Sequence, residues 1–113
     1  MSYNTTSWME AMVRIIEDNR EALQELCRRF RVRRLDLFGS AVGQAFDQDS
    51  SDLDFLVEFL ELRENECADT YFGLLEGLQG LFRREVDLVM FSAVKNPYFR
   101  ESIERSRTLL YAA

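Results

Sequence analysis

Two aspartates, Asp52 and Asp54, lie two positions apart in a segment whose side chains alternate between apolar and polar. Residues two apart on a β-strand project from the same face, so their carboxylates would lie within about 7 Å of each other. Two like charges at this distance repel unless a cation lies between them. Mg²⁺ is commonly held by one or two carboxylates together with substrate phosphates. The pair therefore predicts a divalent-metal site, and a solvated strand face is the alternative.

A short turn of small residues precedes this pair. Gly39 and Ser40 follow an apolar segment at residues 32–38, and eleven residues separate Ser40 from Asp52. A glycine lets backbone N–H groups approach a phosphate closely, and a serine hydroxyl adds one more donor. Such a turn is by itself an ordinary chain reversal, so its interpretation as a phosphate-binding turn depends on the carboxylates that follow.

A third carboxylate, Asp87, lies inside the apolar run at residues 86–90. A buried charge is costly unless it is paired or binds a metal, which predicts a buried Asp87 that serves as a ligand. Three carboxylates on adjacent strands beside a phosphate-binding turn predict a two-metal site for phosphoryl or nucleotidyl transfer. The only lysine, Lys95, is far along the chain from Gly39, and no glycine-rich loop is present. This favours attack at the α-phosphorus over kinase-like transfer of the γ-phosphoryl group.

The composition excludes several other chemistries. The chain contains no His, which excludes His-based zinc sites and Ser-His-Asp triads. A formal net charge of -6 has the wrong sign for neutralising phosphates, so we expect no direct nucleic-acid binding. No apolar run approaches the ~20 residues of a membrane span, so we expect no membrane contact and a cytoplasmic protein. Cys27 and Cys67 have no metal-ligand spacing and are expected to be reduced thiols.

Hydrophobic periodicity predicts the elements that must position the carboxylates. Helical spacing predicts helices over about residues 7–30, 71–82 and 97–106, the last with Asn96 as its N-cap and Pro97 in its first turn. Strands are expected at 32–38, 52–59 and 86–91, and residues 109–111 are expected to form an apolar tail. This order predicts one α+β domain over residues 1–113, with a small mixed three-stranded sheet covered by helices.

Two other features depend on the helices. Three glycines, Gly73, Gly77 and Gly80, fall inside the second predicted helix and weaken it by roughly 1 kcal/mol each relative to Ala, so we expect them to permit close packing. Five arginines gather between residues 28 and 34, after the first predicted helix. We expect a solvated helix end near the negative pole of the helix dipole, with contact to a nucleotide or partner as the alternative for this cluster and for Lys95.

The segments Leu37-Phe38-Gly39-Ser40, Asp52-Leu53-Asp54-Phe55-Leu56-Val57 and Val86-Asp87-Leu88-Val89 together resemble the motif of the minimal nucleotidyltransferase family. The stretch from Asn96 to Tyr111 is similar to the helix and tail that end this family's domain. The likeness covers about residues 30–111 and implies the polymerase beta-like nucleotidyltransferase fold. The chain departs from the family at Ala41-Val42-Gly43, where many members have an Arg before the glycine.

The resemblance also implies roles for individual residues. Gly39 and Ser40 would bind the triphosphate of ATP, and Asp52, Asp54 and Asp87 would be catalytic carboxylates that hold two Mg²⁺ ions. Many members of the family are antitoxins paired with HEPN-domain toxins, and such antitoxins can transfer AMP from ATP to a toxin tyrosine. We therefore expect a Mg²⁺-dependent protein adenylyltransferase that acts as an antitoxin on a HEPN-type partner.

Two further functions remain open at this level. A noncatalytic antitoxin would neutralise its partner by occlusion alone, and the retention of a buried, costly Asp87 argues against it. A small-molecule nucleotidyltransferase, of the kind that modifies aminoglycosides, would need an added helical domain or a dimer to complete its pocket. One core of this size has little spare surface to build a pocket for tRNA or an antibiotic as well as ATP, so we expect the acceptor to be on another chain.

Overall fold

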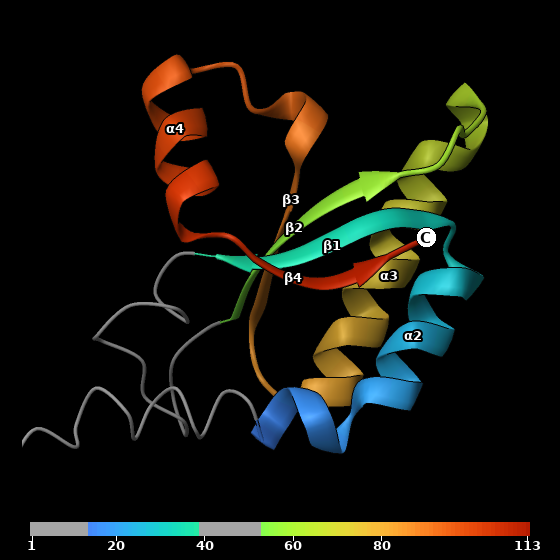
Figure 1. Ribbon diagram of the computed structural model, residues 1–113. Helices are drawn as coiled ribbons and strands as arrows, with labels where there is room; N and C mark the ends of the chain where they lie inside the picture. The colour runs from blue at the N-terminus through green and yellow to red at the C-terminus, as the bar shows by residue number, and fades with distance from the viewer. Residues whose placement is uncertain (1–13, 39–52) are drawn as a thin grey trace, which may run out of the picture.

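The computed structural model describes residues 14–38 and 53–113, which are built around a four-stranded sheet (Figure 1). The strands are β1 (Val32–Phe38), β2 (Leu53–Phe59), β3 (Val86–Met90) and β4 (Thr108–Ala112), in the order β3-β2-β1-β4. β1 is antiparallel to both of its neighbours, whereas β2 and β3 are parallel. The predicted α+β class with a mixed sheet is confirmed.

The predicted number of strands is wrong, because the apolar tail forms a fourth strand. β4 pairs with β1 through Leu35 opposite Tyr111 and Leu37 opposite Thr108, with a register shift at the middle of the pairing. Leu110 and Tyr111 pack against the main core. An apolar tail of this length has no turn signal to mark it as a strand, and its pairing depends on the free edge of β1.

One face of the sheet is covered by two helices, α2 (Arg20–Arg29) and α3 (Cys67–Phe82), which lie side by side under it (Figure 1). A short 3-10 turn, η2 (Glu64–Glu66), leads into α3. The main core lies between these helices and the sheet, and contains Leu23 and Cys27 of α2 and Leu74, Leu78 and Phe82 of α3. The alternation predicted for β2 is confirmed, since Leu53, Phe55 and Val57 all enter this core.

The helix predicted over residues 7–30 is interrupted within the described chain. Residues 14–18 are helical, Asn19 is a turn, and α2 begins at Arg20. The Asn19 side chain donates from Nδ2 to the carbonyl oxygen of Ile15 at 2.8 Å. Asparagine competes in this way with helical backbone hydrogen bonds, which explains a break that the apolar spacing alone does not show. Residues 7–13 lie outside the described residues.

The other face of the sheet is covered at one end by the 3-10 turn η3 (Phe91–Ala93) and by helix α4 (Pro97–Ser106). A smaller apolar cluster of Phe38, Leu56, Val94 and Ile103 joins α4 to the sheet. Asn96 caps α4, because its side-chain oxygen accepts hydrogen bonds from the N–H groups of Tyr98 and Phe99 at 2.9 and 3.2 Å. The predicted start of the last helix is therefore confirmed. In the described ranges, no helix is long and apolar enough to cross a membrane.

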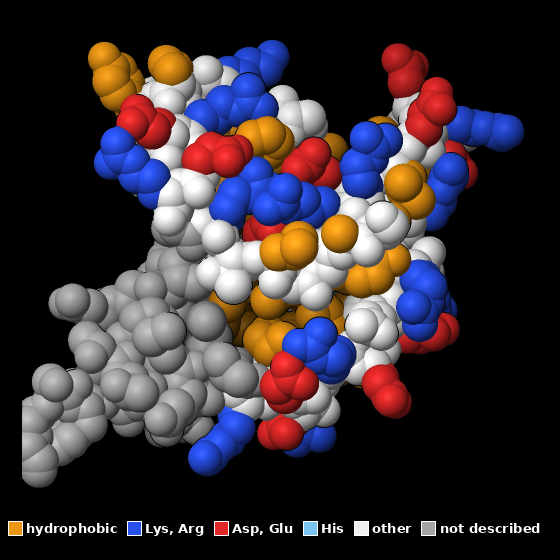
Figure 2. Space-filling model, in the orientation of Figure 1, with side chains coloured by type: hydrophobic (Ala, Val, Ile, Leu, Met, Phe, Trp, Pro, Cys, Tyr) orange, Lys and Arg blue, Asp and Glu red, His pale blue; other side chains and the backbone are white. Residues whose placement is uncertain are grey.

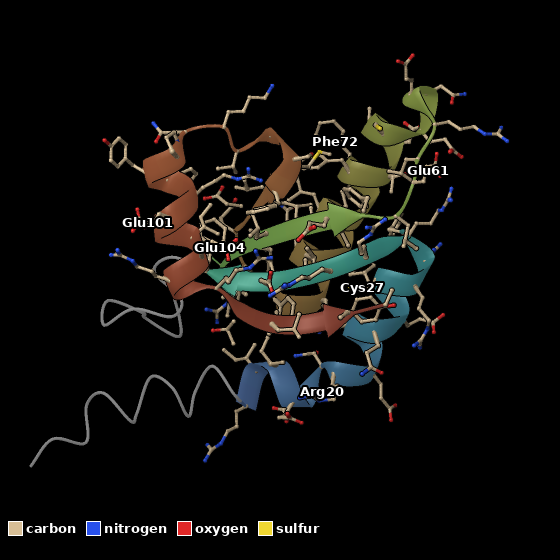
Figure 3. The ribbon with its side chains drawn as sticks, turned by 45° about the horizontal axis from the view of Figure 1, so that its top comes forward. Arg20, Cys27, Glu61, Phe72, Glu101 and Glu104 are labelled. Carbon is tan, nitrogen blue, oxygen red and sulfur yellow. The ribbon has the colours of Figure 1, made fainter. Side chains whose placement is uncertain are left out.

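Both cysteines are free thiols, in agreement with the sequence prediction. Cys27 is fully buried under the sheet (Figure 3), and this burial raises the pKa of its thiol to about 12. Cys67 is half-buried at the start of α3. A protonated, buried thiol is unreactive, so Cys27 serves as a small apolar core residue.

Two of the three glycines of α3 allow it to lie close to α2. A Cβ on Gly73 would overlap the ring of Phe30, and one on Gly77 would lie 2.5 Å from Cδ1 of Leu26. A Cβ on Gly80 would meet no atom within 4 Å. The close-packing interpretation thus holds for Gly73 and Gly77 and not for Gly80.

This difference gives a matched pair of substitutions. Gly80→Ala should stabilise the protein by about 0.5–1 kcal/mol, because alanine is the better helix former and has open space. Gly73→Ala should lower the free energy of unfolding by about 1–3 kcal/mol, because the added methyl group must displace the Phe30 ring. Urea unfolding of both variants measures the difference, and a Gly73→Ala variant as stable as Gly80→Ala would contradict the packing interpretation.

Candidate functional site

The structure brings two of the three predicted catalytic carboxylates together. Asp54 of β2 and Asp87 of β3 are register partners on neighbouring parallel strands. Neighbouring strands lie about 4.8 Å apart, and register partners project from the same face of the sheet. The two residues are thus adjacent in the sheet although they are far apart along the chain. The register places two acids side by side on one face of the sheet.

A pocket of about 410 Å³ contains this carboxylate pair. Its lining comes from three strands and two helices, and consists of Phe38, Asp54, Tyr71, Leu75, Val86, Asp87, Leu88, Val89 and Phe99. The hydroxyl of Tyr71 donates to the carbonyl oxygen of Leu88 at 2.5 Å, which joins α3 to the edge strand β3 beside the pocket. We refer to this cavity as the carboxylate pocket.

The environment predicted for Asp87 is wrong. Its neighbours Val86 and Leu88 are buried, but Asp87 itself is exposed because alternate residues of a strand face opposite sides. An exposed carboxylate costs little folding free energy. The presence of Asp87 therefore does not argue against a noncatalytic antitoxin. Asp54 is half-buried and also forms an interaction within the protein. The case for a catalytic site thus depends on the register of the two acids.

The remaining predicted site residues, Gly39, Ser40 and Asp52, lie outside the described residues. β1 ends at Phe38, the residue before Gly39, and Phe38 is the register partner of Asp54. In the described part of the chain, no group of three His, Cys, Asp or Glu side chains could hold a metal ion. The three-carboxylate site and the phosphate-binding turn therefore stay predictions.

A buried ionic cluster, which the sequence patterns did not predict, lies on the same face of the sheet as Asp54 and Asp87. Asp36 in the middle of β1 has no exposed surface, and its carboxylate accepts from Nε of Arg107 at 2.7 Å and from Nε of Arg34 at 3.1 Å. Arg107 also donates to Glu58 at 3.3 Å and to Glu104 at 3.0 Å. The cost of burying a charge in an apolar run, which was expected at Asp87, arises instead at Asp36, whose neighbours Leu35 and Leu37 are apolar.

Arg107 keeps its charge in this cluster. Burial alone would lower the pKa of its guanidinium, but the hydrogen bonds that it donates to Asp36, Glu58 and Glu104 outweigh burial and raise that pKa above its ordinary value. The guanidinium also lies over the ring of Phe91, 4.9 Å from its centroid. Figure 2 shows arginine and acidic side chains interleaved between α4 and the sheet. Arg107 thereby fixes the C-terminal end of α4, whose first turn supplies Phe99 to the carboxylate pocket.

The arginine cluster between residues 28 and 34 does not act as one unit. Arg28 and Arg29 lie in the last turn of α2, as expected for a helix end. Arg31 pairs with Glu66 at 3.7 Å, and Arg34 pairs with Asp36. Arg33 and the exposed Lys95 do not line the carboxylate pocket.

Comparison with known proteins identifies the class. The model of the nucleotidyltransferase domain family matches residues 19–110, and the chain belongs to this family of enzymes. Two proteins of Methanocaldococcus jannaschii named as protein adenylyltransferases are relatives. One is 34% identical over 90 residues, which cover 80% of this chain and 85% of the relative. The other is 33% identical over 97 residues, which cover 85% of this chain and 94% of the relative.

Solved structures share the fold. A minimal nucleotidyltransferase superposes with a TM-score of 0.60 at 32% identity, over 82% of this chain and 90% of the other. A chain of a toxin–antitoxin structure with AMP-PNP gives a TM-score of 0.60 at 21% identity, over 79% and 69%. A chain of the complex between a tri-AMPylated Shewanella oneidensis HEPN toxin and its MNT antitoxin gives 0.55 at 18% identity, over 94% and 73%. The nucleotidyltransferase fold expected from the sequence is confirmed.

The ionic cluster predicts a specific pattern of stability. Arg107→Leu should lower the free energy of unfolding by about 3 kcal/mol, because Asp36 would stay buried with an incompletely paired charge. Replacing both partners, Asp36→Leu with Arg107→Leu, should restore much of this loss. Arg105→Leu is the control, because Arg105 forms only an exposed pair with Glu101, and it should cost under about 0.5 kcal/mol. Equal losses in Arg107→Leu and Arg105→Leu by urea unfolding would refute the role of the cluster.

Proposed function

We propose that this protein transfers AMP from ATP, with Mg²⁺, to a hydroxyl group of a partner protein, and that a HEPN-type toxin tyrosine is the acceptor. The observation that carries the proposal is the register pairing of Asp54 with Asp87 next to the end of β1. The names of the relatives, protein adenylyltransferases, support a protein acceptor. The AMPylated HEPN toxin in a structure of similar fold supports the kind of partner.

The residues of the carboxylate pocket fit Mg²⁺. Asp54 and Asp87 supply adjacent carboxylate oxygens, the ligands that this ion prefers, and Asp52 of the predicted motif would supply a third carboxylate. A bound Mg²⁺ would offset the negative charge of the triphosphate and of the carboxylates. Without such a cation, two aligned acids in an anion-binding pocket would repel the substrate.

The chain's own residues would orient the reactants. Gly39 and Ser40 would bind the triphosphate through backbone N–H groups and the serine hydroxyl. Asp87 is exposed and therefore accessible to an acceptor, so its carboxylate would accept a hydrogen bond from the attacking hydroxyl group. The apolar wall of the pocket, formed by Phe38, Leu75 and Phe99, would limit access of water to the α-phosphorus.

Metal and nucleotide binding can be measured without a partner. Mg²⁺ or Mn²⁺ should raise the melting temperature, and a nonhydrolysable ATP analogue should raise it further, because both bind the native state. Asp52→Asn combined with Asp54→Asn should abolish these shifts. Glu76→Gln is a control, because Glu76 is an exposed acid of α3 outside the pocket lining. A wild-type protein that responds to neither metal nor nucleotide would refute the proposed site.

Catalysis and occlusion are separated by one conservative change. Asp87→Asn keeps the size of the side chain and should preserve binding to the acceptor, but it should lower the rate of AMP transfer by at least about 100-fold. Transfer is followed with ATP labelled at the α-phosphorus, which should label the acceptor and release pyrophosphate. An Asp87→Asn variant that still neutralised the toxin fully would favour occlusion. Label from γ-labelled ATP alone, with ADP as product, would overturn the reaction class.

A further inference from the structure

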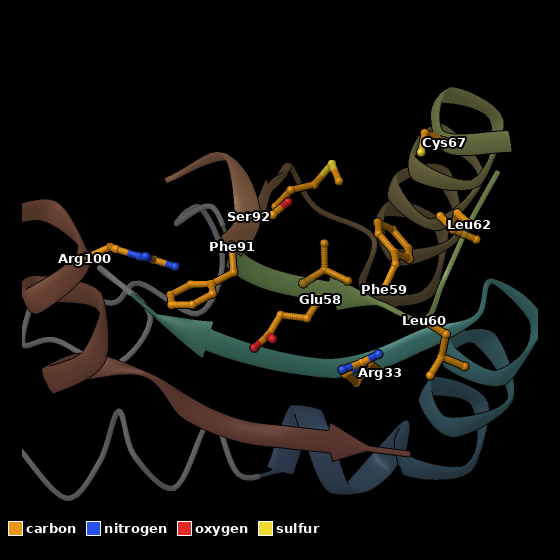
Figure 4. Close-up of a pocket in the computed structure, with 11 residues that line it drawn as sticks. Arg33, Glu58, Phe59, Leu60, Leu62, Cys67, Phe91, Ser92 and Arg100 are labelled. Carbon is orange, nitrogen blue, oxygen red and sulfur yellow. The ribbon is translucent and has the colours of Figure 1, made fainter. Parts of the chain in front are cut away.

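A second pocket, of about 540 Å³, lies at the C-terminal ends of β2 and β3 (Figure 4). It shares no lining residue with the carboxylate pocket. Its floor is apolar and includes Phe59, Leu60 and Met90. Leu60 is 37% exposed, so part of this floor faces solvent. Exposed apolar surface inside a polar rim is typical of a surface that another protein covers.

The rim of this second pocket carries positive charge. Arg33 of β1 and Arg100 of α4 line it from two sides (Figure 4). Within residues 14–38 and 53–113, neither arginine forms an ion pair. The only acid in the lining, Glu58, already accepts a hydrogen bond from Arg107. The pocket therefore has two unneutralised cations and an acid whose charge is already balanced.

The Arg100 side chain is positioned by stacking on an aromatic ring. Its guanidinium lies 4.3 Å from the centroid of the Phe91 ring, and Figure 4 shows it directed from α4 toward Phe91. Stacking on an aromatic face leaves the N–H donors at the edge of the guanidinium available for a carboxylate. The net charge of -6 does not prevent the approach of an acidic group, because salt screens distant charges beyond about 8 Å in physiological conditions.

The two pockets are neighbours along the same elements. Val89 lines the carboxylate pocket and Met90 lines the second pocket, and the same division holds for Phe99 and Arg100 at the start of α4. A protein that presents a hydroxyl group to Asp54 and Asp87 would therefore contact the second pocket as well.

We infer that the second pocket recruits the acceptor protein by receiving an apolar side chain flanked by acidic residues. The apolar side chain covers the floor, and the acidic groups pair with Arg33 and Arg100. This inference rests on the proposed function, because it describes how the acceptor of that reaction is held. It gives the partner a chemical signature, an acidic and apolar surface segment near the modified hydroxyl group.

Charge reversal tests the recruitment. Arg33→Glu combined with Arg100→Glu should weaken acceptor binding by at least about 30-fold and raise KM for the acceptor similarly. The kcat at saturating acceptor and the thermal shifts with Mg²⁺ and ATP analogue should stay within about twofold, because neither arginine lines the carboxylate pocket. The control, Arg28→Glu with Arg29→Glu, makes the same change in net charge at the end of α2. An equal loss of binding in both double variants, or no loss in the first, would overturn the inference.

A peptide probe separates this inference from the proposed function. The probe is a fluorescent hexapeptide with phenylalanine and leucine between two pairs of acidic residues, measured by anisotropy on the full chain. The wild type should bind it at least about tenfold more tightly than a counterpart with lysines in place of the acids, and the Arg33→Glu, Arg100→Glu variant should lose this preference. Recruitment of an acidic and apolar protein segment would be overturned if the wild type bound both peptides with equal affinity. It would also be overturned if the small aromatic acid phenylbutyrate bound as tightly as the acidic peptide. Peptide discrimination without AMP transfer would refute the proposed function alone.

Discussion

The buried ion pair between Asp36 and Arg107 is the polar contact that joins the sheet to the segment between α4 and β4, beside the smaller apolar cluster under α4. Asp36 lies in the middle of β1, and Arg107 follows α4, 71 positions later. A fully buried carboxylate needs a partner, and Arg107 satisfies it while also bonding Glu58 of β2. The pair therefore fixes where α4 ends, and the same chain segment continues directly into β4. The cover over the second face of the sheet and the edge strand meet at this contact, which adds to the apolar cluster under α4 and to the pairing of β4 with β1.

The carboxylate pocket depends on a different constraint, the parallel register of β2 and β3. α3 connects these strands and is held on two sides, by close contact of its glycines with α2 and by the bond from Tyr71 to Leu88. A slip of one residue between the strands would move Asp87 to the opposite face from Asp54. Helix α3 contributes no acid to the site, yet its position determines whether Asp54 and Asp87 are neighbours.

In the proposed function, the two pockets would divide the work of a transferase between neighbouring surfaces. The carboxylate pocket has acids and an apolar wall, which suit a metal and a nucleotide, whereas the second pocket has an apolar floor and cations. Because β3 and the start of α4 contribute to both, one partner can contact both at once. If the proposed function holds, a small domain would in this way use a large protein as its acceptor without enclosing that acceptor in a deep cavity.

Local patterns in the sequence predicted most of the elements and the face of the strand side chains, but not the break at Asn19 or the strand β4. The alternation over residues 53–59 placed Leu53, Phe55 and Val57 in the core, and Asn96 with Pro97 marked the start of α4 correctly. Only the tertiary structure decided which strands are neighbours, since that depends on packing between segments distant in the chain. It paired the tail with β1, aligned Asp54 with Asp87, and made Asp36 the buried acid and Asp87 the exposed one. Periodicity encodes the direction of a side chain, whereas the cost of burying its charge depends on what other segments lie over it.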